Sequence, residues 1–144
     1  MKALLKNLAS IRLGYQVRKR ITNEEDGICG ILTLKDIDQS HIRWDKLFRT
    51  NDLVREDFLL KKDDILFPAK GKEMNSIYIS EEVSPTIISS YFYIIRIKSR
   101  DQVLPGYLSW YLNQSPAQRY INQYIKGTVI HYINISSLED LPIE

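Results

Sequence analysis

The chain has 144 residues and a formal net charge of +2, and its residues are 44% apolar and 26% charged. This length and balance are typical of one globular domain, so we expect residues 1–144 to form a single domain. No stretch approaches the ~20 apolar residues of a membrane helix, and the apolar run near the start is too short for a secretory signal. We therefore expect a cytoplasmic protein that has no contact with a membrane.

The charge is unevenly distributed along the chain. Residues 1–72 contain 15 Lys and Arg and 11 Asp and Glu, whereas residues 73–144 contain 5 and 7, so the first half is basic and the second acidic. A basic bias in one half is a weak indication of nucleic-acid binding, because solvated surfaces show the same bias. Cys29 is the only cysteine, so no disulfide can form within the chain. Its apolar neighbours favour a buried structural thiol.

The first two thirds of the chain favour strands joined by turns. Arg96 and Lys98 alternate with isoleucines, which predicts one wet face where the most strongly predicted strand ends. Pro68 is expected to stop the strand that precedes it. The expected strands are residues 8–13, 28–34, 65–67, 77–79 and 86–97, all rich in residues that suit a pleated surface.

The apolar periodicity changes from strand-like to helical after residue 104. Pro105 favours the start of one helix. Ser115 and Pro116 favour the N-cap and first residue of a second helix. Gly127 is expected to follow the C-terminal end of that helix, where a left-handed backbone is common.

The last part of the chain returns to a strand pattern. Residues 128–135 favour a strand, and residues 136–139 match a capping box that begins a short helix ended by Pro142. The whole pattern predicts a mixed α+β fold, in which a mostly antiparallel, twisted sheet packs with one or two C-terminal helices.

The sequence lacks the spacings of known catalytic or metal sites. It has no Cys-x-x-Cys, no Gly-x-Ser-x-Gly, no phosphate-binding Gly-x-x-x-x-Gly-Lys and no Gly-x-Gly-x-x-Gly. We therefore expect no metal, no cofactor and no enzymatic activity. Asp64 followed by Lys70 faintly resembles the carboxylates and lysine of a nuclease, but residues 61–64 are better interpreted as a solvated turn.

The basic residues of the chain support a binding function instead of a catalytic one. Basic side chains in loops can reach phosphates, and arginine can also contact guanine in the major groove. Solvation of the loops explains these charges equally well. For most of the tyrosines and for His131, packing within the protein is the better interpretation. The basic residues expected in loops are Arg18, Lys19, Arg20, Lys70 and Lys72.

The order of segments resembles one target-recognition domain of the S (specificity) subunit of type I restriction–modification enzymes. Residues 8–15 (LASIRLGY) and 34–37 (LKDI) are similar to the family's I-x-x-G-Y/F and K-D-I motifs, and residues 59–71 (LLKKDDILFPAKG) to L-K-x-G-D-I-L-x-x-x-R-G. The further similar segments are 89–92 (SSYF), 104–113 (LPGYLSWYLN), 127–133 (GTVIHYI) and 138–143 (LEDLPI).

The chain also departs from the family pattern. Asp63 occupies a position where the family has glycine, Lys70 one where arginine is common, and Tyr91 one where histidine is frequent. Lysine is a poorer bidentate ligand than arginine. In the family a long helix follows each such domain, and this sequence stops at Glu144, before that helix, so we expect an isolated domain.

The resemblance implies recognition of a short half-site of double-stranded DNA, with methyl transfer and cleavage performed by other subunits. Its expected partners are double-stranded DNA and the modification (methyltransferase) subunit, and it leaves a homodimer open. Two alternatives stay open: a protein-interaction module that binds the modification subunit without reading DNA, and a nuclease fragment. By position in the motifs, the residues expected to face DNA are Arg18, Lys19, Arg20, Lys70, Lys72, Ser90, Tyr91, Thr128 and His131.

Overall fold

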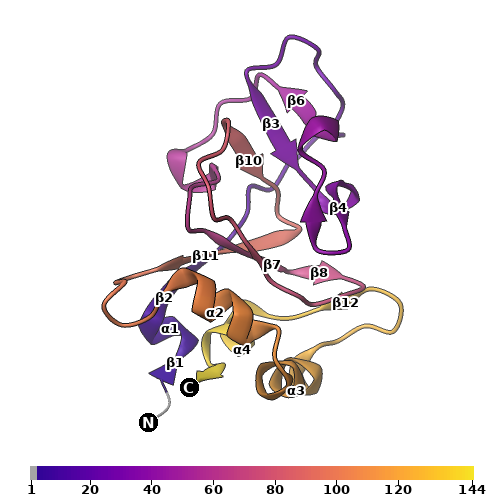
Figure 1. The fold of residues 1–144 in the computed structure, drawn as a ribbon. Coiled ribbons are helices and arrows are strands. Elements are labelled where there is room, and N and C mark those ends of the chain that lie inside the picture. Colours follow the sequence, from indigo (N-terminus) through magenta and orange to yellow (C-terminus); the bar gives the residue numbers. More distant parts are fainter. Residues whose placement is uncertain (1–2) are drawn as a thin grey trace.

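The computed structural model describes residues 3–144 (Figure 1). Its helices are α1 (Leu5–Leu8), α2 (Pro105–Leu112), α3 (Ser115–Tyr124) and α4 (Ile135–Glu139), with short 3-10 helices at Leu34–Asp36, Trp44–Lys46 and Glu56–Phe58. Its strands are β1 (Ala3–Leu4), β2 (Ala9–Leu13), β3 (Cys29–Leu32), β4 (Ile37–Asp38), β5 (His41–Ile42), β6 (Phe48–Thr50), β7 (Ile65–Pro68), β8 (Lys70–Gly71), β9 (Ile77–Tyr78), β10 (Thr86–Ile88), β11 (Phe92–Ile97), β12 (His131–Tyr132) and β13 (Pro142–Ile143).

A sheet with the order β2-β11-β7-β9 crosses the middle of the molecule, and all its pairs are antiparallel. Successive side chains along β11 point to opposite faces. Tyr93 and Ile95 enter the core on one face, while Phe92 and Ile94 enter the core on the other. Because both faces are covered there, residues 92–95 of this strand are all hydrophobic and buried rather than alternating with polar residues.

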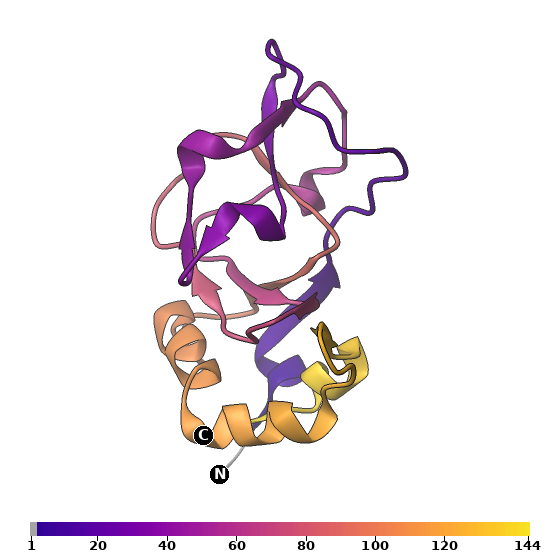
Figure 2. The ribbon, with the colours of Figure 1, turned by 90° about the vertical axis from the view of Figure 1, so that its right-hand side faces the viewer.

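The two faces of this sheet are covered by different kinds of structure (Figures 1 and 2). On one side β3 lies between β6, its antiparallel partner, and β10, its parallel partner, with the β4–β5 hairpin beside them. On the other side lie α1, α2, α3 and α4, with β1 paired to β13 so that the C-terminal strand lies next to the beginning of the described chain. Figure 2 shows the helices gathered at one end of the molecule.

The expected fold class is confirmed: the structure is mixed α+β, with mostly antiparallel strands and few helices. Cys29 is a buried free thiol, as expected. No helix within residues 3–144 is long and apolar enough to cross a membrane.

The most strongly predicted strand, residues 86–97, is in fact two strands. Residues 89–91 interrupt it, so that β10 joins β3 in one sheet while β11 joins β2 and β7 in another. The wet face expected near its end is also wrong at Arg96, because this side chain is largely buried and pairs with Asp64. Pro68 is the last residue of β7, so the strand ends at the proline as expected.

The expected helix ends need correction as well. Gln114, not Ser115, is the N-cap of α3, and no side chain caps that end. The helix ends at Tyr124, and Gly127 lies beyond it in a loop with φ of 92°. Asn134, not Ser136, is the N-cap of α4. Only His131–Tyr132 of the strand expected over residues 128–135 forms a strand, because the residues before it make an exposed loop.

Candidate nucleic-acid interface

Five of the nine residues expected to face DNA line one pocket of about 410 Å³. Its walls come from the segment after β2, the start of β8 and the turn between β10 and β11. We refer to it as the basic pocket. Of the expected residues it contains Lys19, Arg20, Lys70, Ser90 and Tyr91, and its other lining residues are Gln16, Val17, Ile21 and Ser89.

Gly14 allows the first wall of the basic pocket to form. The backbone of Tyr15 donates a 2.7 Å hydrogen bond to the carbonyl of Ile88, which holds the segment after β2 against the end of β10. A Cβ atom at Gly14 would lie only 2.1 Å from the carbonyl oxygen of Ser89. Only glycine lets the two backbones approach this closely.

The second and third walls are held together by the backbone of Ala69. Its amide donates to the carbonyl of Tyr91 at 2.8 Å, so the start of β8 lies against the turn that contains Ser90 and Tyr91. The Nζ atom of Lys70 consequently lies 5.2 Å from the centre of the Tyr91 ring. This is a cation–π distance, and it orients the ammonium group at the pocket.

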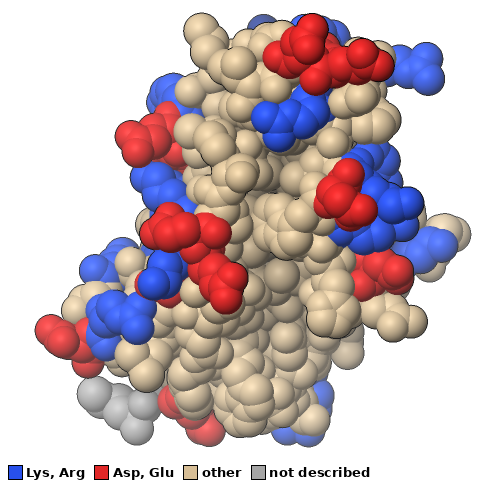
Figure 3. All heavy atoms as spheres, turned by 45° about the horizontal axis from the view of Figure 1, so that its top comes forward, with Lys and Arg blue, Asp and Glu red and all other residues tan. Residues whose placement is uncertain are grey.

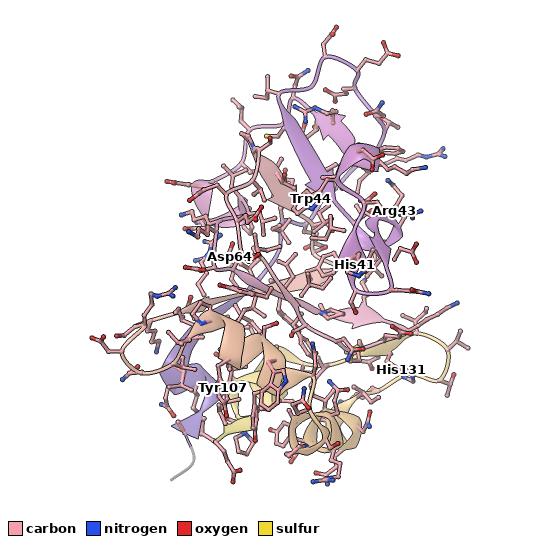
Figure 4. The ribbon with its side chains drawn as sticks, in the orientation of Figure 1. His41, Arg43, Trp44, Asp64, Tyr107 and His131 are labelled. Carbon is pink, nitrogen blue, oxygen red and sulfur yellow. The ribbon has the colours of Figure 1, made fainter. Side chains whose placement is uncertain are left out.

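His131 and Thr128 belong to the hairpin of residues 126–132, which is closed by two backbone hydrogen bonds between Lys126 and Tyr132 and lies beside the pocket. In the β8–β12 pair His131 lies opposite Gly71 and Tyr132 opposite Lys70, which places His131 next to the strand that contains Lys70 (Figure 4). The Nδ1 atom of His131 lies 3.1 Å from the carbonyl oxygen of Gly127. The loop before β12 is exposed, Thr128 included.

The charge of the pocket is largely uncompensated. Lys19 pairs with Asp52 at 3.3 Å. Within residues 3–144, neither Arg20 nor Lys70 has a carboxylate within ion-pair distance. In the space-filling view of Figure 3, red and blue side chains alternate around the rim and leave the middle tan, so that face presents no broad surface of one sign.

The structure leaves some expected residues outside the pocket. Lys72 is exposed and follows β8, Thr128 lies in the hairpin loop, and Arg18 is exposed next to Lys19 without lining the pocket. Among the residues that sequence reasoning missed, Ser89 is the most informative, because it is 2% exposed and yet lines the pocket. Ser89 belongs to the same Ser89-Ser90-Tyr91 segment from which Ser90 and Tyr91 were chosen by their position in the motif.

A larger hollow of about 710 Å³ lies between the β4–β5 hairpin and the segment after β9. His41 and Trp44 line it, and Figure 4 shows both away from His131. It is lined by the carboxylates Asp45, Glu81 and Glu82, with Arg49 as its basic residue. Because the acidic groups outnumber the basic one, phosphates are repelled from this hollow, and the basic pocket is the better nucleic-acid site.

Asp64, the centre of the faint nuclease pattern, is occupied by structural contacts. It is 2% exposed, and its carboxylate accepts hydrogen bonds from Arg96 at 2.8 and 3.1 Å and from the amide of Lys61 at 2.8 Å. The solvated turn expected at residues 61–64 is thus wrong for Asp64. Among residues 3–144, no three His, Cys, Asp or Glu side chains lie close enough together to hold a metal ion.

No protein-family model matches the sequence, and no curated protein matches it. Solved structures share the fold, among them two S (HsdS) subunits. One is the S subunit of a type I restriction–modification system from M. genitalium, with a TM-score of 0.68 and 16% identity over 99% of this chain and 33% of that one. The other is the HsdS subunit from Thermoanaerobacter tengcongensis, with a TM-score of 0.65 and 12% identity over 99% of this chain and 32% of that one.

This chain thus spans about a third of the length of each subunit and has the fold of that part. The resemblance to a specificity-subunit domain, inferred from the order of short motifs, is confirmed at the level of the fold.

Proposed function

We propose that this chain is a target-recognition domain that reads a short half-site of double-stranded DNA for a type I restriction–modification system and catalyses no reaction itself. The observation that supports this most is the basic pocket, where Arg20, Lys70 and Tyr91 converge from three separate segments. The shared fold with two specificity subunits agrees with it.

The proposed residues divide into two groups by chemistry. Arg18, Lys19, Arg20, Lys70 and Lys72 contact phosphates and fix the position of the domain on the duplex. Ser90, Tyr91, Thr128 and His131 lie on turns or loops or at a strand end beside these cations and contact base edges in the major groove. The loops are suited to this role because the sheet holds their ends while their tips remain exposed.

The proposal also includes the partner. An exposed aromatic face on α2 supports contact with another protein, the modification subunit, because Leu104 beside α2 and Tyr107 and Trp110 on it are 54%, 42% and 56% exposed. The rings of Tyr107 and Trp110 lie 5.7 Å apart. Large exposed aromatic side chains are typical of protein interfaces. A cytoplasmic location, a single domain over residues 1–144 and the capacity to form a homodimer remain predictions.

A selection of random duplex DNA on the purified protein tests the proposed function. It is performed at about 50 mM salt and repeated at about 200 mM, because phosphate contacts weaken steeply over this range. Enrichment of a motif of a few base pairs is the expected result. Retention without enrichment, lost at the higher salt, would mean phosphate attraction alone. No retention at either salt would favour a protein-interaction module in place of a DNA reader.

A further inference from the structure

Ser89 has a buried hydroxyl group that the fold leaves without a partner. Its side chain is 2% exposed, and its Oγ atom is the one buried side-chain polar atom within residues 3–144 that lacks a hydrogen bond. Buried hydroxyls nearly always have partners, because an unmade hydrogen bond destabilises the folded state. An exception therefore calls for an explanation, and this one lines the basic pocket.

The backbone fixes the position of this serine. Its amide donates to the carbonyl of Leu32 and its carbonyl accepts from the amide of Phe92, both at 3.2 Å. Gly14 lies against it from the other side, where a Cβ atom would clash with the Ser89 carbonyl. A serine whose backbone is held in this way is preorganised for a ligand, because little backbone freedom is lost on binding.

The pocket offers donors and positive charge, and no carboxylate lines it. Its lining residues include Ser89, whose hydroxyl can donate a hydrogen bond, and the cationic residues Lys70 and Arg20. Lys19 also lines it, but its charge is shared with Asp52, which lies outside the lining. A base edge presents donors as well as acceptors, whereas the non-bridging oxygens of a phosphodiester only accept. The chemistry of the pocket therefore matches a phosphate.

We infer that the basic pocket seats one backbone phosphate of the DNA, with the Ser89 hydroxyl donating to a non-bridging oxygen and Lys70 and Arg20 pairing with its charge. The Tyr91 ring beneath the Lys70 ammonium holds that cation at the pocket. This inference rests on the proposed function. It adds that one phosphate, at one place in the half-site, fixes the position of the domain along the DNA and so determines which bases the neighbouring residues contact.

Ser89→Ala separates this role from a structural one. Removing an unpartnered buried hydroxyl leaves the thermal stability unchanged or raises it. Losing a hydrogen bond to a charged phosphate lowers DNA affinity about tenfold, equally for specific and scrambled duplexes, and leaves the salt dependence unchanged because no charge is lost. Lys70→Ala lowers affinity and also reduces the slope of log affinity against log salt by about 1.

Ser109→Ala is the matched control. Ser109 is 4% exposed, but its hydroxyl lies 2.7 Å from that of Ser76. This variant loses stability and keeps its DNA affinity, the reverse of Ser89→Ala. Affinity of Ser89→Ala equal to that of the unaltered protein would overturn the phosphate seat while leaving the proposed function intact.

A scan of the selected half-site with single methylphosphonates locates the phosphate. At one position the neutral linkage weakens binding by the unaltered protein and weakens binding by a Ser89→Ala, Lys70→Ala double variant less, because only Arg20 then remains to pair with that phosphate. Equal losses in both proteins at every position would overturn the inference. A complete lack of DNA binding by the unaltered protein at low salt would overturn both the seat and the proposed function.

Discussion

The hydroxyl of Tyr93 donates a 2.7 Å hydrogen bond to the carbonyl oxygen of Ile133. Tyr93 belongs to β11 in the central sheet, and Ile133 follows β12 directly, so this bond joins the sheet to the strand that presents His131. The amide of Ile133 in turn donates to the carbonyl of Ala69 at 3.2 Å. One buried phenol thus helps to align the hairpin with the basic pocket.

Tyr93→Phe should lower the free energy of unfolding at neutral pH by about 1–3 kcal/mol, because the buried carbonyl of Ile133 loses its partner. Burial raises the pKa of Tyr93 above its ordinary value of 10.0. The contribution of this phenol is therefore fully present below pH 10 and is lost as the pH rises through the raised pKa. Chemical denaturation at increasing pH should show that the difference in free energy of unfolding between the unaltered protein and Tyr93→Phe becomes smaller in alkali. A difference in free energy of unfolding that stays the same at every pH would contradict this role of the Tyr93 hydroxyl.

Gly127→Ala should distort the hairpin loop. Gly127 has a φ of 92°, and an added Cβ would lie 2.1 Å from the carbonyl oxygen of Ile130. The left-handed backbone alone costs about 1–2 kcal/mol for other residues. We expect weaker discrimination between the selected half-site and a scrambled duplex, measured by fluorescence anisotropy. Gly71→Ala is the control, because its Cβ would meet nothing closer than 3.7 Å. Equal discrimination by both variants would show that the loop does not read bases.

Gly14→Ala should open the basic pocket from its first wall. The methyl group would have to displace the backbone of Ser89, since the gap to its carbonyl oxygen is only 2.1 Å. Overpacking of this kind costs about 1–3 kcal/mol of stability. Beyond that loss, we expect weaker DNA binding under conditions in which the variant is fully folded, as judged by circular dichroism. Undiminished affinity in the folded variant would show that the segment after β2 does not help to bind DNA.

Asp64→Asn should destabilise the protein by about 3–5 kcal/mol, because Arg96 would keep a largely buried charge without its partner. Asp64 is 2% and Arg96 23% exposed at the side chain. Urea denaturation measures the loss. If Asp64 were instead a nuclease carboxylate, the unaltered protein would cleave DNA in the presence of Mg²⁺ and the variant would fail to do so. Cleavage of that kind would revive the nuclease alternative.

The approximate starts of the helices could be predicted from the sequence, because they depend on residues that are close together in the chain. Pro105 and Pro116 lie near the starts of α2 and α3, where the missing amide hydrogen is not needed. The strand over residues 86–97 was predicted as one piece because its residues all suit a pleated surface, and nothing local marks the break at Ser89, Ser90 and Tyr91. That break is caused by tertiary pairing, because β10 pairs with β3 in one sheet whereas β11 pairs with β2 in another.

The basic pocket could be predicted only in part. Its cations were recognisable because basic residues in loops are accessible, and motif order pointed to Ser90 and Tyr91. Their convergence could not be predicted, because the pocket joins three segments separated by about 20 and about 50 residues of sequence, through backbone bonds such as that from Ala69 to Tyr91. Ser89 was missed because an unpartnered hydroxyl can be recognised only once all its neighbours are in place.

The most direct test of the central claim is a titration of the isotopically labelled protein with the selected duplex, followed by the backbone amide signals in NMR spectra. The account predicts that the largest shifts fall in residues 15–21, 70–72, 89–91 and 127–132, which surround the basic pocket and its hairpin. Largest shifts at residues 41–45 and 80–84, around the acidic hollow, or along α2 would contradict it, because DNA would then bind a different face.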